Sequence, residues 1–295
     1  MTRVLVIIVS YNGMPWLERC LGFVYPGANT GQFAPDLYVW DNDSTDGSAD
    51  YVAKHFPGVH LVRSAENVGF AKANNMGFQY ALDHGYDYVY LLNQDAWLAP
   101  GALETLVAAA QAHPDYAVLS PLQYQDGYQA FDLQFAKLYH GSEEGMGFQT
   151  ASEPDEVVEV KRIMAAHWLV PVGALKTVGP FEEELFPLYG QDDDWCNRAR
   201  YHKLKVGIVP GAKAVHDRAQ RREPKEKVIR RNYYIGSLIR LCDPNRPLWE
   251  RFLFVCLFTL VKSVKYGSLL PFKYFRQICG QLPAVRRHRD FSIRC

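Results

Sequence analysis

The chain has 295 residues, of which 48% are apolar and 22% charged, so it can bury a sizeable core as a soluble protein of one large or two small domains. Six scattered cysteines lack the spacing of a disulfide framework or a metal site, which favours reduced thiols in the cytoplasm. The apolar run at residues 4–9 is too short for a signal peptide, so we expect no secretory leader.

The first 113 residues alternate between apolar runs typical of strands and segments of helical character. Strands are predicted over residues 4–9, 37–40, 59–62 and 86–92. Helices are predicted over residues 15–24, 49–55, 70–82 and 101–113. Strands and helices that alternate at this spacing predict an α/β fold with a largely parallel sheet and right-handed crossovers.

This alternation ends after a strand predicted at residues 116–119. Residues 121–157 are rich in Gly, Gln, Tyr and Glu without a clear period, and we interpret them as loops that shape a binding surface. Further strands are predicted at residues 157–162 and 205–209, with a helix at 191–202 between them. From Lys225 onward the chain is predicted to be helical.

Charge divides the chain into two parts. From Arg218 to the end there are 18 basic and 5 acidic residues, whereas residues 1–217 carry 14 basic and 27 acidic ones. We therefore expect an acidic catalytic body, residues 1–217, and a basic helical extension, residues 218–295, that meets something anionic.

Within the extension, residues 252–261 are apolar on all sides but well short of the ~20 residues of a bilayer span. Lys262, Lys265, Lys273 and Arg276 follow, interleaved with aromatic residues. Two interpretations have similar weight: a buried helix with solvated basic flanks, and an interfacial helix on anionic lipid headgroups. Nucleic acid is a weaker third partner, because no recognised binding motif accompanies the charge.

Four polar clusters follow predicted strands or open helices. They are residues 10–13, the acidic turn that begins at Asp41, residues 66–75, and residues 93–95. Each one alone has a conformational explanation, since strand-to-helix turns favour Asn, Asp, Ser and Gly. The carboxyl ends of parallel strands share one edge, however, and open α/β sheets bind their ligands there. Together the clusters predict a binding site in which the Asp41 carboxylate contacts a ligand.

Asp95 is a candidate metal ligand. A carboxylate at a strand end is a hard oxygen donor suited to Mg²⁺ or Mn²⁺ that bridges a diphosphate. As an N-cap for the next helix it would stand rather far from Pro100. His216 could add a metal or phosphate contact, although a lone histidine is more often structural.

The motifs, taken in order, resemble the inverting family 2 glycosyltransferases of GT-A fold. The resemblance runs through SYNG, VWDNDSTDGS, ENVGFAKANNMGF, LLNQDAW and LYGQDDDWCNRAR, and covers residues 4 to 217. It implies a nucleotide-sugar donor at the carboxyl edge of a Rossmann-like sheet, with the pyrimidine base at Asp41 and a Mg²⁺ or Mn²⁺ ion at Asp95 and His216. The donor-binding residues that it implies are Ser10, Asn12, Asp41, Asn67, Gly69, Asn74 and Asn93.

The same resemblance implies that Asp192 is the catalytic base. Inversion is a single in-line displacement, so one carboxylate must take the proton of the acceptor hydroxyl. Gln191 stands where the family usually has Glu, and Trp195 where Leu is common. From the residues alone, the three adjacent acids could instead stabilise a helix N-terminus through its dipole.

The function implied is transfer of a hexose or deoxyhexose from a UDP- or dTDP-sugar to a lipid-linked or polysaccharide acceptor in bacterial surface-glycan synthesis. Rhamnosyl- and galactosyltransferases are the implied subgroups, and the basic extension would hold the protein at the inner face of the membrane. A non-catalytic nucleotide-sugar binder, with Gln191 marking a degraded site, is the alternative. Residues 166–173 and 179–186 resemble acceptor-side segments, in which Trp168 either stacks on a sugar or belongs to the core.

Overall fold

The computed structural model describes residues 2–25, 34–140, 157–217 and 224–294. Within these residues one nine-stranded sheet has the order β3-β2-β1-β4-β8-β6-β9-β5, with β7 paired to β9. The strands are β1 Val4–Ser10, β2 Asp36–Asp41, β3 His60–Arg63, β4 Tyr88–Asn93, β5 Ala96–Leu98, β6 Tyr116–Tyr124, β7 Val158–Val160, β8 His167–Pro171 and β9 Lys205–His216.

The first four strands form a parallel half-sheet, as the alternation of strands and helices predicts. β1 lies between β2 and β4, and β3 pairs with β2. Residues 4–8 of β1 are buried throughout, because helices cover both faces of the sheet. The α/β fold class is therefore confirmed.

Beyond β4 the sheet is mixed, which departs from the largely parallel sheet expected. β8 lies antiparallel between β4 and β6, and both β5 and β7 are antiparallel to β9. β5 has three residues, too few to show a recognisable period, and the five residues of β8 lack the alternation of apolar and polar side chains that marks a half-buried strand. The segment read as loops also contains the end of β6 and helix α5 Leu133–His140, while residues 141–156 lie outside the described part.

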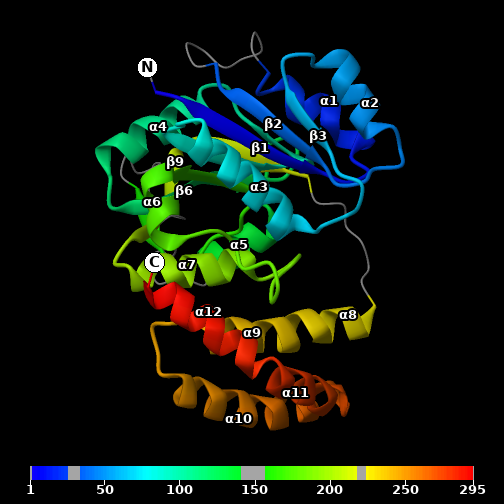
Figure 1. Ribbon diagram of the computed structural model, residues 1–295, viewed down its shortest axis with the longest axis vertical. Helices are drawn as coiled ribbons and strands as arrows, with labels where there is room; N and C mark the ends of the chain where they lie inside the picture. The colour runs from blue at the N-terminus through cyan, green and yellow to red at the C-terminus, as the bar shows by residue number, and fades with distance from the viewer. Residues whose placement is uncertain (1, 26–33, 141–156, 218–223, 295) are drawn as a thin grey trace.

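Helices form layers on the two faces of the sheet (Figure 1). The face that carries Val6 and Ile8 is covered by α1 Met14–Gly22, α2 Ser48–His55 and α4 Ala102–Ala112. The face that carries Leu5 and Ile7 is covered by α3 Phe70–Asp83, α6 Val172–Val178 and α7 Gln191–Tyr201.

The C-terminal helices form a further layer below α7 and confirm the predicted helical extension (Figure 1). They bury an apolar cluster of their own, which also takes in Leu185 and Phe186 from the loop before α7. The boundary predicted after residue 217 adjoins residues outside the described part and stays a prediction. The elements are α8 Lys225–Ile229, the π-helical turn η2 Arg230–Ile235, α9 Gly236–Cys242, α10 Leu248–Tyr266, α11 Leu270–Gly280 and α12 Leu282–Arg294.

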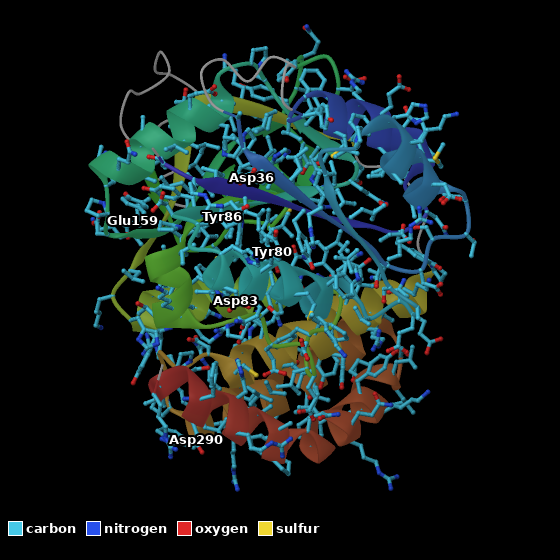
Figure 2. All side chains as sticks on the ribbon, turned by 45° about the horizontal axis from the view of Figure 1, so that its top comes forward. Asp36, Tyr80, Asp83, Tyr86, Glu159 and Asp290 are labelled. Atoms are coloured by element: carbon cyan, nitrogen blue, oxygen red, sulfur yellow. The ribbon has the colours of Figure 1, made fainter. Side chains whose placement is uncertain are left out.

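A cluster of paired polar side chains closes the amino edge of the parallel half-sheet (Figure 2). The Tyr86 hydroxyl donates to Asp36 Oδ2 at 2.8 Å, and the Arg3 guanidinium lies 4.2 Å from the centre of the Tyr86 ring. Burial and the bond to Asp36 raise the pKa of Tyr86. These three side chains therefore satisfy one another at the amino edge.

Candidate active site at the carboxyl edge

Hydrogen bonds join the four polar clusters at the carboxyl edge of the sheet, so their predicted convergence is confirmed. The first cluster is bonded to the second, since the Asn12 N–H donates to Ser44 Oγ at 2.9 Å. The second is bonded to the third, since Asn42 Nδ2 donates to Asn67 Oδ1 at 2.9 Å. The fourth is bonded to the first through Gln94, whose side-chain oxygen accepts the Tyr11 N–H at 2.8 Å.

Asp41 and Ser10 end neighbouring strands, directly opposite each other in the β1–β2 register. They are 4% and 1% exposed. Asp41 Oδ2 accepts the N–H of Ser44 at 3.1 Å, whereas Asp41 Oδ1 and Ser10 Oγ have no hydrogen-bond partner among the described residues. An unpaired buried acceptor costs about 1–3 kcal/mol, so this pair fits a ligand that brings an N–H donor. The N3–H of a uracil or thymine ring is such a donor.

The turn conformations around this pair are fixed by side-chain to backbone bonds. Asn12 has a positive φ of 49°, and its Oδ1 accepts the N–H of Thr45 at 2.9 Å. Asn67 Oδ1 accepts both the Asn42 amide and the N–H of Gly69, the latter at 3.1 Å. Both asparagines therefore shape the walls of the edge as well as facing it.

Gly69 connects the carboxyl edge of the sheet to the loop that precedes α7. Its φ is +85°, and a Cβ there would lie 2.8 Å from the carbonyl oxygen of Pro187, so only glycine fits. Two residues later, the Ala71 N–H donates to that same oxygen at 3.2 Å. Asn74, a predicted nucleotide-sugar-binding residue, is 2% exposed, and its side-chain amide donates to the Phe70 carbonyl. Its side chain therefore points toward the backbone of its own helix, α3.

Asp95 and His216 are brought together by the antiparallel pairing of β5 with β9, in which Ala96 lies opposite His216. Asp95 Oδ1 and Asn93 Nδ2 each lie 3.5 Å from His216 Nε2. The Asp95 side chain is 27% exposed and that of His216 only 5%, so the carboxylate is open to the edge. A carboxylate oxygen beside an imidazole nitrogen is a donor set that would suit Mg²⁺ or Mn²⁺, and Asp95 and His216 would hold such an ion here.

His167 on β8 is hydrogen-bonded to the residue before His216 and to β4. Its Nε2 donates to the Val215 carbonyl at 2.9 Å, so Nδ1 is the acceptor for the Tyr90 hydroxyl at 2.8 Å. Burial lowers the pKa of His167 to about 3, which keeps the ring neutral. His167 thus holds β8 against the end of β9 through Val215, the residue that precedes His216.

Asp192 lies in the first turn of α7. The loop that contains Ala165 and Ala166 links it to the carboxyl edge of the sheet. The Asp192 carboxylate accepts the N–H of Asp193 at 2.9 Å and a backbone hydrogen bond from Ala165. The next residue, Ala166, accepts the N–H of Asn93 through its carbonyl at 3.1 Å. Burial and the negative charge of Asp193 raise the pKa of Asp192 to about 7, a value suited to a general base near neutral pH.

The start of α7 is set by the C-terminal layer. Gly190 has a φ of +94°, and a Cβ there would lie 2.8 Å from Ile235 Cγ2 and 3.1 Å from Ile239 Cδ1. Gln191 is 6% exposed and its side chain is buried in the protein, whereas Asp192 is only partly buried. The glutamine that replaces the family's usual Glu therefore points away from solvent.

A buried charge network, which we call the Asp194 network, fastens the other side of α7 to α12. Asp194 lies 2.9 Å from both Arg198 Nε and His288 Nε2, and His288 Nδ1 lies 3.0 Å from Glu182. The two carboxylates raise the pKa of His288 to about 9, although burial alone would lower it. Cys242 completes a set of three potential metal ligands, but a protonated imidazole and a thiol whose pKa is raised by burial do not fit a cation.

The structure decides between the two interpretations left open for Trp168. Trp168 is fully buried, with ring centres 5.5 Å from Trp195 and 5.9 Å from Phe181, so it belongs to the core and not to a sugar platform. The exposed ring at the edge is Tyr11, at 48%. Its place inside SYNG is a signal that sequence reasoning could have used.

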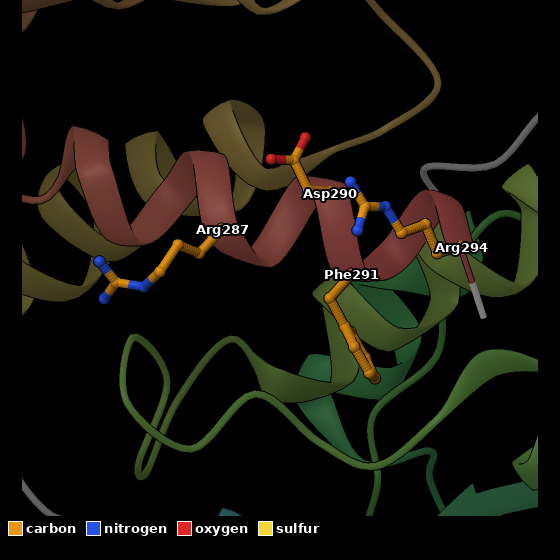
Figure 3. A pocket seen from close by; sticks show the side chains of 4 residues that line it. All are labelled: Arg287, Asp290, Phe291 and Arg294. Carbon is orange, nitrogen blue, oxygen red and sulfur yellow. The ribbon is translucent and has the colours of Figure 1, made fainter.

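Figure 3 shows an open hollow on α12. It measures about 540 Å³ and is lined by Arg287, Asp290, Phe291 and Arg294. None of the predicted site residues lines it.

Comparison with known proteins identifies the family of this chain. Residues 5–155 match the family model for Glycosyl transferase family 2. Over 275 residues the chain is 26% identical to the N-acetylglucosaminyl-diphospho-decaprenol L-rhamnosyltransferase of Mycobacterium tuberculosis, covering 85% of this chain and 88% of that one.

Solved structures share the fold at low sequence identity. TarS from S. aureus has a TM-score of 0.60 at 14% identity, over 86% of this chain and 69% of its own. GalNAc-T7 with UDP, GalNAc and Mn²⁺ has a TM-score of 0.57 at 14% identity, over 84% and 53%. The mannosyltransferase PcManGT from Pyrobaculum calidifontis, with GDP-Man and Mn²⁺, has a TM-score of 0.54 at 19% identity, over 98% and 73%. With a family match over just more than half of its length, the chain belongs to glycosyl transferase family 2 and is a glycosyltransferase of GT-A fold.

Proposed function

We propose that the protein transfers a hexose or deoxyhexose from a UDP- or dTDP-sugar to a lipid-linked or polysaccharide acceptor, with inversion at the anomeric carbon. The observation that carries this proposal is the loop that bonds to Asp192 through Ala165 and to Asn93 through Ala166. It supports a proton acceptor of near-neutral pKa beside the edge where a donor would bind. Asp192, rather than residue 191, is the side chain whose pKa suits a proton acceptor, so Gln191 in place of Glu leaves that role filled.

In the proposed reaction the acceptor hydroxyl oxygen bonds to the anomeric carbon while the bond to the nucleoside diphosphate breaks. Asp192 takes the hydroxyl proton on the face opposite the leaving group. A Mg²⁺ or Mn²⁺ ion held by Asp95 and His216 would neutralise charge on the departing diphosphate.

Donor recognition is assigned to the carboxyl edge. Asp41 accepts the pyrimidine N3–H through its unpaired Oδ1, and Ser10 offers a second unpaired oxygen beside it. The remaining donor-side residues line or support the walls. They are Asn12, Asn67, Gly69, Asn74 and Asn93.

The name of the mycobacterial relative supports L-rhamnose as the sugar and a diphospho-lipid-linked N-acetylglucosamine as the acceptor. TarS binds UDP and UDP-GlcNAc, and two of the structural neighbours hold Mn²⁺, which supports a nucleotide sugar and a divalent ion here. We assign the protein to the cytoplasm, at the inner face of the membrane where such acceptors are reached.

Calorimetric titration with UDP- and dTDP-sugars, in Mn²⁺ and in Mg²⁺, tests the donor half of the proposal. Transfer to an N-acetylglucosaminyl-diphospho-lipid analogue, with the anomeric configuration of the product read by NMR, tests the other half. We expect metal-dependent binding of one donor and a single inverted product. A chain that binds no UDP- or dTDP-linked sugar, or that binds one and transfers it to no acceptor, would contradict the assignment.

A further inference from the structure

One face of α10 is apolar and uncovered. Every exposed residue of this helix from Leu253 to Val264 is apolar. The face continues past the end of the helix through Leu269, which is 78% exposed, and Phe272. Its members, with their exposed fractions, are Trp249 71%, Leu253 55%, Phe254 42%, Leu257 58%, Leu260 54%, Val261 61% and Val264 84%.

These side chains are at positions where a globular protein normally carries polar residues. Val255 and Thr259 are the buried residues of α10 and point to the opposite side, into the C-terminal layer. The exposed positions recur every three or four residues, so they form one stripe along the helix. A contiguous apolar surface of this kind marks an interaction site rather than chance exposure.

Positive charge borders the stripe. Residues 248–280 contain five basic residues and one acidic residue, Glu250. Lys265, Lys273 and Arg276 are exposed at the end of α10 and on α11. Arg251 is the basic residue of this segment with an ion pair recorded to a carboxylate, that of Asp243. An apolar stripe with a basic border complements a surface that is apolar inside and negative outside.

α10, which carries the stripe, lies in the outermost layer of the molecule, on the side of the C-terminal helices away from the sheet (Figure 1). In the described part of the chain, helices lack the combination of length and apolarity that a membrane crossing requires. α10 therefore suits a position in the plane of a membrane surface, not across it.

We propose that α10 and α11 dock on a lipid bilayer that contains anionic lipids. The stripe enters the headgroup and acyl boundary, with Trp249 at the interface, while Lys265, Lys273 and Arg276 contact lipid phosphates. A second copy of this chain is a poorer occupant, because a pair of identical faces would bring these cations toward one another. The inference rests on the proposed function only for its purpose, which is to bring a lipid-linked acceptor to Asp192.

α10, the helix that carries the stripe, is connected to α7 by one layer of packed side chains from η2 and α9. The Tyr233 hydroxyl on η2 lies 2.6 Å from Thr259 Oγ1 on α10, and the Arg240 guanidinium on α9 lies 5.3 Å from the centre of the Phe254 ring. Ile235 and Ile239, from the same two elements, close on Gly190 at the start of α7. A membrane bound at α10 is thus held in fixed relation to the proposed base.

Sedimentation of the full-length protein with vesicles tests the proposal. One vesicle is phosphatidylcholine alone, and the other also contains phosphatidylglycerol. We expect binding to the second, and about 100-fold weaker binding when Leu257→Glu and Val264→Glu are combined. Leu133→Glu on α5 is the matched control, since Leu133 is 56% exposed and Leu257 58%. It should bind like the wild type.

Several results would overturn the proposal: no binding to either vesicle, equal binding to both, or equal binding by wild type and the double variant. A dimer in light scattering that the double variant disperses, without vesicle binding, would assign the stripe to a second copy and overturn it too. Donor titration of the double variant is unaffected in every case, because these side chains are exposed and outside the proposed site. A failed vesicle experiment therefore leaves the proposed function standing, and a failed donor titration leaves the docking result standing.

Discussion

The carboxyl edge of the sheet and the first turn of α7, which we propose as the donor side and the base side of one site, are built in different ways. At the donor edge, Ser10 and Asp41 are the last residues of strands, and the parallel register places them opposite each other. On the other side, the orientation of α7 depends on contacts with residues much later in the chain. Asp194 meets His288, which is 94 positions away.

In the first case neighbouring residues determine the local structure, and in the second case contacts between residues far apart in the sequence determine it. A strand end with an acidic turn specifies the donor edge almost by itself, because the sheet supplies the rest of the geometry. α7 needs the whole C-terminal layer, through Gly190 on one side and the Asp194 network on the other. Substitutions on the donor side should therefore change ligand binding, while those around α7 should also change stability.

The largest effect is expected at the base itself. Asp192→Asn removes the proton acceptor, and we expect kcat to fall by about 10²–10⁴-fold. The donor dissociation constant should stay near the wild-type value, because the substitution lies outside the donor edge. Steady-state transfer kinetics and donor calorimetry measure the two quantities. Retention of full kcat would mean that another group takes the proton.

The Asp194 network should make stability depend on pH. The pKa of His288 rises from 6.5 to about 9 on folding, so its contribution is complete below pH 6.5 and is lost as pH rises through 9. The full contribution is about 3 kcal/mol of unfolding free energy. Urea unfolding at several pH values measures it, with His288→Gln as the variant in which this part of the pH dependence should vanish. An unchanged profile would break the assignment of α7's anchorage to this network.

On the donor side, Asp41→Asn should weaken donor binding by about 10–100-fold, the value of one hydrogen bond to a buried charge. The amide offers a weaker acceptor to the pyrimidine N3–H. Melting temperature should change much less than in His288→Gln, which sharpens the contrast between the two sides. Equal affinity in both proteins would remove Asp41 from donor recognition.

The smallest effect is expected one residue beyond the base. Asp193 raises the pKa of Asp192 by its charge, and it is paired with Arg162 at 3.0 Å. Asp193→Asn removes the charge and releases the arginine, so the pKa of Asp192 should fall from about 7. The acid limb of the kcat profile should move to lower pH, by about one unit. A shift to higher pH would contradict this electrostatic account.

The convergence of the polar clusters at the carboxyl edge can be predicted from the sequence because its signals are local. Asp41, Asn12 and Asn67 each sit in a turn whose chemistry can be recognised from neighbouring residues. β5 escapes prediction because three residues carry too little periodicity, and β8 because its five residues show no alternation of apolar and polar side chains. β5 brings Asp95 to His216, and β8 reverses the strand direction after β4. The burial of Trp168 escapes for a different reason, since residue type alone does not tell an indole in a core from one that stacks on a sugar.

The contact between Gly69 and Pro187 has a consequence for how each substrate affects the binding of the other. The turn at Gly69 belongs to the donor edge, and Pro187 belongs to the loop that leads into α7. The proposed donor and acceptor sides of the site therefore share this contact, and neither turn can shift without disturbing the Ala71–Pro187 hydrogen bond. Thermodynamic reciprocity then applies across that contact: any factor by which bound donor tightens acceptor binding is the factor by which bound acceptor tightens donor binding.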